Sequence, residues 1–159
     1  MRCWTEIDVR VMSNVLMDRV REVQAFSARQ LSAEGACGYT DVEEWKQVQL
    51  RLAQALAELE RTEGRTPDEE GERVLAILMG YCVTVRNGRN VSDALRCAER
   101  VLPLLTDEVL RCKLAVYCYL EVPDEELLEL ATSLIGTLKR QGRRDEVIPL
   151  EKLLNDLLS

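Results

Sequence analysis

The sequence predicts an all-α protein in which about seven helices pack as antiparallel pairs around two buried helices, near residues 74–85 and 109–120. Apolar residues recur every three or four positions along most of the chain, which is typical of helices with one buried face. Two stretches are apolar on nearly every face and must be covered all round. Aromatic residues are only 4% of the chain, so the core must consist mainly of Leu, Val, Ala, Met and Cys.

The more apolar of these stretches, residues 110–120, is predicted to be a central helix. After Lys113 it continues with an unbroken run of apolar or half-apolar residues to Leu120. This run is far shorter than the roughly 20 residues that cross a bilayer. The residue before a proline avoids helical geometry, so we expect the helix to end near Val122. Pro123 and the acids after it are expected to begin the next helix.

The N-terminal part is predicted to form a helical pair over residues 7–61. The first helix spans about residues 7–31, with Val11 and Val15 widening its apolar face. Thr40 and Glu43 have the spacing of a capping box, which predicts a second helix to about Arg61.

Thr66-Pro-Asp-Glu69 is a stronger helix start, because it combines an N-cap threonine, a proline at the first helical position and a capping-box acid. The helix is expected to cover residues 67–85. Its second half is apolar almost all round, and Gly80 would let another helix approach closely.

Four further helices are predicted, at about 92–105, 106–120, 123–139 and 145–157. Thr106 is the expected cap of the second of these, and Pro103 should disrupt the last turn of the first. Leu157 is expected to face the core. The helix starts at Thr66 and Thr106 suggest stacked helix pairs with a period of about 40 residues, as in helical repeats. We expect one domain over residues 1–159.

Composition excludes several functional classes. The net charge of −7 and the sequence pI of about 4.8 argue against direct binding to nucleic acid phosphates. The chain contains no histidine, phosphate loop or dinucleotide fingerprint, and no C-x-x-C pair. We therefore expect no catalytic residue, metal site or cofactor.

No apolar export signal follows Met1, so we expect an intracellular protein. The six cysteines are therefore not expected to form a disulfide framework. The predicted localisation is cytoplasmic, with no membrane contact. Cys82, Cys97, Cys112 and Cys118 lie on apolar helical stretches and are expected to be small buried apolar residues.

Charge is unevenly distributed along the chain. Acids gather at 68–70 and 124–126, and four cations without an acid lie within 139–144. Both acidic runs begin helices, which explains them through helix capping and solubility. The functional alternative is an acidic face that binds a basic protein partner.

The segments Leu75–Tyr81 and Leu110–Leu127, with the acidic entry Thr66–Glu70 before them, resemble the UpxZ family of transcription anti-terminator antagonists. The likeness covers about residues 66–138, and the charged tail after Gly136 departs from the family pattern. It implies a regulator from Bacteroides-type bacteria, encoded in a capsular polysaccharide locus. Such a protein inhibits NusG-like, UpxY-type anti-terminators of other loci by stoichiometric binding, without catalysing a reaction.

The polar residues of the family-like segments are the candidates for partner binding: Glu69, Glu70, Glu121, Asp124, Glu125 and Glu126. Two other functions remain open from the residues alone. One is a helical adaptor of another pathway, and the other is a small helical enzyme that uses carboxylates.

Overall fold

The computed structural model describes residues 9–32, 42–84 and 91–159, and the side chains within these ranges except those of 29–32. Within these ranges the chain forms seven α-helices and one short 3-10 helix, and no strand. The elements are α2 (Val9–Ser32), α3 (Val42–Glu60), α4 (Pro67–Val83), α5 (Val91–Val101), η2 (Leu102–Leu104), α6 (Glu108–Glu121), α7 (Glu125–Arg140) and α8 (Arg144–Leu158).

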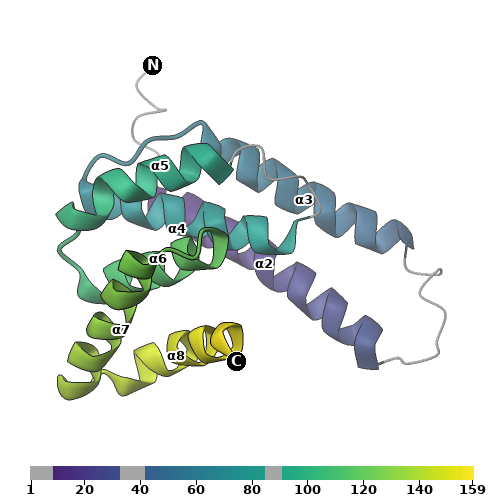
Figure 1. Ribbon diagram of the computed structural model, residues 1–159. Helices are drawn as coiled ribbons and strands as arrows, with labels where there is room; N and C mark the ends of the chain where they lie inside the picture. The colour runs from purple at the N-terminus through teal and green to yellow at the C-terminus, as the bar shows by residue number, and fades with distance from the viewer. Residues whose placement is uncertain (1–8, 33–41, 85–90) are drawn as a thin grey trace.

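The helices are arranged around α4 and α6 (Figure 1). The long pair α2–α3 packs on one side of α4, and α5 covers another side. On its far side α6 is covered by α7 and α8. Consecutive helices α4 and α5, and then α6 and α7, run antiparallel to each other, which confirms the predicted stacked pairs.

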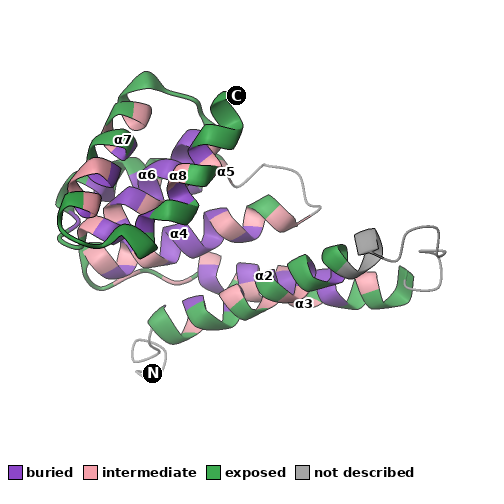
Figure 2. Cartoon of the chain, turned by 90° about the horizontal axis from the view of Figure 1, so that it is seen from below, coloured by how far each residue is buried: buried purple, intermediate pink, exposed green. Residues whose placement is uncertain are grey.

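The two central helices are buried as the sequence predicts. Figure 2 shows the buried residues concentrated where α4, α6 and α8 meet. Five apolar residues of these two helices are each exposed by 3% or less: Val74, Ile77, Leu78, Leu114 and Val116. The missing side chain of Gly80 lets Leu56 of α3 approach, since a Cβ at Gly80 would lie 2.9 Å from the Leu56 Cδ2 atom.

The beginnings of α4 and α6 are joined directly, which was not predicted. The Asp68 carboxylate accepts hydrogen bonds from the Thr106 backbone amide at 2.9 Å and from the Thr106 hydroxyl at 2.6 Å. These bonds lower the pKa of Asp68. They also occupy Thr106, so Asp107 caps α6 instead, accepting from the backbone amides of Val109 and Leu110. The prediction of Thr106 as the cap is therefore wrong.

The other caps agree in part with the sequence. The Thr66 hydroxyl accepts from the Glu69 amide at 3.1 Å, as expected. Pro123 does not begin α7, because Asp124 caps that helix by accepting from the Glu126 amide at 2.8 Å. Thr40 lies outside the described residues.

The turn that follows α7 has the geometry expected of a helix that ends at a glycine. Gly142 has a φ of 82°, which a residue with a side chain rarely adopts. The Arg143 amide donates back to the Leu138 carbonyl at 2.9 Å, and the Gly142 amide to the Lys139 carbonyl. Pro149 lies inside α8, more than one turn from its start.

Several residues expected in the core lie at the surface. Val11 and Val15 are 56% and 42% exposed, because α3 and α4 cover only one side of α2. Leu157 is 47% exposed at the end of the last helix.

Two of the four cysteines expected in the core are elsewhere. Cys82 is exposed, where α4 ends, and Cys97 is half-buried beside Arg73 and Arg100. Cys112 and Cys118 are buried as expected. Burial raises the pKa of Cys112 to about 11 and that of Cys118 to about 12, so both remain thiols at neutral pH.

The packing of α6 predicts a large effect of truncating Leu114. Leu114→Ala removes a fully buried side chain and is expected to lower the unfolding free energy by about 2–5 kcal/mol in urea denaturation. The control is Leu104→Ala, at a site 56% exposed, which should change stability by less than about 0.5 kcal/mol. Equal effects of the two substitutions would contradict the central position of α6.

Candidate partner-binding surface

The six acids proposed from the sequence fall into two groups. Glu69 and Glu70 lie in the first turn of α4, and their carboxylates point back toward the preceding loop. Glu121 ends α6, and the remaining three begin α7 or cap it. The structure therefore does not bring all six together.

Glu69 and Glu70 hold the α3–α4 loop. The Glu69 carboxylate accepts from the Arg65 amide at 2.8 Å and from its guanidinium at 3.1 Å, and the pKa of Glu69 is lowered by these bonds. Glu70 accepts from the Gly64 amide at 2.8 Å and pairs with Arg73 at 2.7 Å. Glu69 is only 9% exposed.

The Glu70–Arg73 pair also joins α4 to α3. The Arg73 guanidinium donates to the Leu59 carbonyl at 3.0 Å, at the end of α3. Burial raises the pKa of Glu70, but the hydrogen bonds from Arg73 and the Gly64 amide outweigh it, and the pKa is lowered. The two acids of α4 thus have structural partners within the chain.

The second group forms what we call the acidic corner: Glu121, Asp124, Glu125, Glu126 and Glu129. Glu129 was not among the predicted candidates, but it follows Glu125 by one helical turn and shares its face. Val122 is 49% exposed within the corner. No lysine or arginine occurs between Lys113 and Lys139. Across the three described ranges, these five carboxylates make no ion pair.

The basic turn at 139–144 differs from the acidic corner because two of its four cations, Lys139 and Arg143, are in ion pairs. Lys139 pairs with Glu151 at 2.7 Å, and Arg143 with Glu146 at 2.6 Å. Arg140 donates to the Thr137 hydroxyl at 3.2 Å. The acidic corner therefore presents more uncompensated charge than the basic turn.

An open groove of about 560 Å³ lies between α2, α4, α6 and α8. Much of its lining is apolar and includes Met17, Leu75, Met79, Tyr117 and Leu150. This groove was not predicted from the sequence, because its walls come from four helices that are distant along the chain. The signal in the sequence was the presence of methionine and tyrosine residues next to the apolar positions of the predicted helices.

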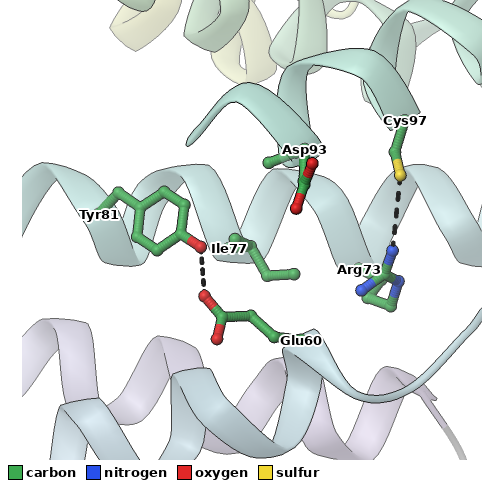
Figure 3. Close-up of a pocket in the computed structure, with 7 residues that line it drawn as sticks. Glu60, Arg73, Ile77, Tyr81, Asp93 and Cys97 are labelled. Carbon is green, nitrogen blue, oxygen red and sulfur yellow. Dashed lines mark hydrogen bonds between the residues drawn. The ribbon is translucent and has the colours of Figure 1, made fainter. Parts of the chain in front are cut away.

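A smaller pocket of about 230 Å³ lies between the ends of α3 and α5, over α4 (Figure 3). It contains groups that could act as acids or nucleophiles, but they bind one another. The Tyr81 hydroxyl donates to Glu60, and the Arg73 guanidinium contacts the Cys97 sulfur at 4.0 Å. Asp93 pairs with Arg96. These interactions connect the three helices.

The described ranges contain no group of three or more Cys, Asp or Glu residues that could hold a metal ion. None of their helices is long and apolar enough to cross a membrane.

The fold and these surfaces define an all-helical protein that offers a charged corner and an open groove. A model of the UpxZ family of transcription anti-terminator antagonists matches residues 15–120. This match covers more than half of the chain, and the chain belongs to that family. It reaches further toward the N-terminus than the predicted likeness over 66–138, and it ends before the acidic corner.

The fold is also similar to a solved structure, the crystal structure of a transcription anti-terminator antagonist UpxZ from Bacteroides uniformis ATCC 8492 at 1.68 Å resolution. The TM-score is 0.65 at 24% sequence identity, over 89% of this chain and 90% of that chain. The shared fold therefore includes the N-terminal helices. No protein with a curated description matches the chain.

The buried pair in α4 predicts a pH-dependent contribution to stability. Glu70→Gln leaves the Arg73 charge without its partner and is expected to cost about 3 kcal/mol at neutral pH. Because the pKa of Glu70 is lowered on folding, its contribution is complete above pH 4.5 and is lost as the pH falls through the folded-state value. Urea denaturation should show that the unfolding free energies of the wild type and Glu70→Gln approach each other as the pH falls below 4.5.

The matched control is Asp93→Asn, which breaks an exposed pair of the same i,i+3 spacing. It should cost less than about 1 kcal/mol. A Glu70→Gln protein as stable as the wild type at every pH would contradict the structural role of Glu70.

Proposed function

We propose that this protein binds a NusG-like, UpxY-type anti-terminator of a heterologous capsular polysaccharide locus and prevents it from acting on RNA polymerase. The observation that carries the proposal is the family match over residues 15–120. We further propose that it acts in the cytoplasm, as a stoichiometric binding protein that does not contact nucleic acid directly.

Two properties of the chain support binding rather than turnover. The polar groups of the pocket between α3, α4 and α5 are engaged in contacts within the chain. The acidic corner, in contrast, has carboxylates that form no ion pair in the described part of the chain, on an exposed turn. With a net charge of −7, the protein would attract a basic protein surface and repel nucleic acid phosphates.

The stoichiometric mechanism predicts a fixed endpoint in a titration. Increasing amounts of the purified protein are added to an anti-terminator from a foreign capsule locus, and read-through transcription is measured in vitro. Inhibition should rise linearly and end at a fixed molar ratio, independent of incubation time. Complex formation is measured in parallel by isothermal titration calorimetry.

Two outcomes would contradict this mechanism. Inhibition that grows with time at substoichiometric amounts would indicate a catalyst. The absence of a complex with every such anti-terminator would remove the proposed function.

The acidic corner is proposed as one part of the binding surface, with Glu121, Asp124, Glu125 and Glu126 as its candidates from the sequence. Glu69 and Glu70 are proposed to contribute through the loop that they hold. The triple variant Glu121→Lys/Glu125→Lys/Glu129→Lys should slow association with the anti-terminator and reduce its salt dependence. Its stability should change by no more than about 1 kcal/mol, from the first turn of α7.

The control reverses three exposed acids elsewhere, as Glu63→Lys/Glu99→Lys/Asp156→Lys. It changes net charge by the same amount, so any general electrostatic effect appears in both proteins. Stopped-flow association at low and moderate salt distinguishes them. Identical rates for the two variants would place the binding surface away from the corner.

A further inference from the structure

We propose that the groove between α2, α4, α6 and α8 receives an apolar segment of the anti-terminator, with an acidic side chain of that segment opposite Lys113. Basic residues of the same segment would then meet the acidic corner. This inference rests on the proposed function. It adds the place where the partner segment binds, the direction in which its charges run, and the kinds of side chain that it carries.

The first observation is that one face of α6 joins the groove to the acidic corner. Lys113 and Tyr117 line the groove, and Glu121 belongs to the corner. The three residues follow one another at intervals of four, so they lie in a row along the helix. A bound segment that follows this row passes from a cation, over an apolar ring, to a set of carboxylates.

The second observation is the charge of the groove walls. In a protein with a net charge of −7, the groove has three cations and two acids on its walls. Four of these five charges are in ion pairs: Arg10 with Glu72, Arg21 with Asp18, and Glu146 with Arg143. Lys113 is in no ion pair with any residue that the structure describes. Lys113 contributes, after Arg143, to the lowered pKa of Glu146, so it lies near that acid of the groove wall. No ion pair holds its ammonium, and a carboxylate of the partner would bind it.

The third observation is a buried hydroxyl without a partner. Ser13 lines the groove from α2 and is 8% exposed, yet its Oγ atom makes no hydrogen bond within the described chain. A buried hydroxyl without a partner is destabilising. The Oγ atom is covered by neighbouring atoms, so a polar group of a bound segment would satisfy it only after those neighbours move aside. Ser13 is therefore a polar contact that a movement of the groove wall would offer to a bound segment.

The fourth observation is the apolar lining of the groove. Met17 and Met79 reach it from α2 and α4, and both are only partly buried. Methionine side chains are flexible and adapt to apolar partners of different shape. An open, methionine-lined groove of about 560 Å³ between helices suits an amphipathic protein segment, whose apolar side chains would enter it.

The test uses the full chain, the purified anti-terminator that it binds, and overlapping peptides that cover the anti-terminator sequence. Lys113→Glu and Lys113→Met should each weaken binding of the anti-terminator by about tenfold or more. Lys152→Glu, at an exposed site of α8 outside the groove, should weaken it less than about twofold. A binding peptide should contain an acid whose change to lysine restores affinity for Lys113→Glu.

Ser13 provides a variant that separates binding from folding. Ser13→Ala removes the unpartnered hydroxyl and introduces the best helix former, so the free protein should melt at the same or a higher temperature. Its affinity for the anti-terminator should nevertheless fall severalfold. A lowered melting temperature with unchanged affinity would assign Ser13 to the fold alone.

Nuclear magnetic resonance of isotope-labelled methionine methyl groups locates the occupant directly. The methyl signals of Met17 and Met79 should shift on adding the anti-terminator. Met12 is the internal control, because its sulfur lies 3.8 Å from the Thr62 hydroxyl, on the side of α2 away from the groove. Shifts that appear when the free protein is concentrated, without the partner, would show self-association and overturn the inference.

The outcomes for the groove and for the function are distinct. A complex that forms equally well with wild type, Lys113→Glu and Ser13→Ala overturns the groove inference and leaves the proposed function intact. The absence of any complex, with unchanged methionine signals, removes both. Loss of binding in the Lys113 variants but not in Lys152→Glu, with restoration by the charge-exchanged peptide, supports both the groove inference and the proposed function.

Discussion

The parallel packing of α6 on α4 leaves both helices with apolar surface that only other helices can cover. Both carry apolar side chains around most of their circumference, and Leu78 and Leu114 have no exposed area. The Asp68–Thr106 hydrogen bonds fix the two helix starts against each other. The α2–α3 pair and α5 then cover α4, while α7 and α8 cover α6. The register of α4 and α6 therefore determines where all the surfaces lie.

The proposed binding surface follows from this arrangement. α7 and α8 cover α6 on one side, and α4 covers it on another. The row of Lys113, Tyr117 and Glu121 lies along α6 between these two covered sides. The groove lies at one end of this row and the acidic corner at the other. Lys113 and Tyr117 fall within the residues that match the family, and the corner lies just beyond them.

Local signals in the sequence predicted the helices and the central residues, because apolar spacing and an N-cap such as Thr66 act within a few residues. They could not predict contacts between distant residues. The acidic runs at 68–70 and 124–126 look alike in sequence, yet Glu70 meets Arg73 and the Gly64 amide, whereas the second run makes no ion pair with any residue that the structure describes. Thr106 was misassigned for the same reason, since its partner Asp68 lies in another helix. The groove depends on four helices, and no local pattern describes it.

Site-specific photocrosslinking at position 117 tests the central claim most directly, because Tyr117 lies between the groove and the acidic corner. A photoreactive phenylalanine analogue replaces Tyr117 in one protein and Val11, on the exposed side of α2, in another. Each is irradiated with the bound anti-terminator, and the crosslinked peptide is identified by mass spectrometry. The account predicts a crosslink from position 117 to one segment with acidic, apolar and basic residues in that order, and none from position 11. Crosslinks from position 11 alone would contradict it.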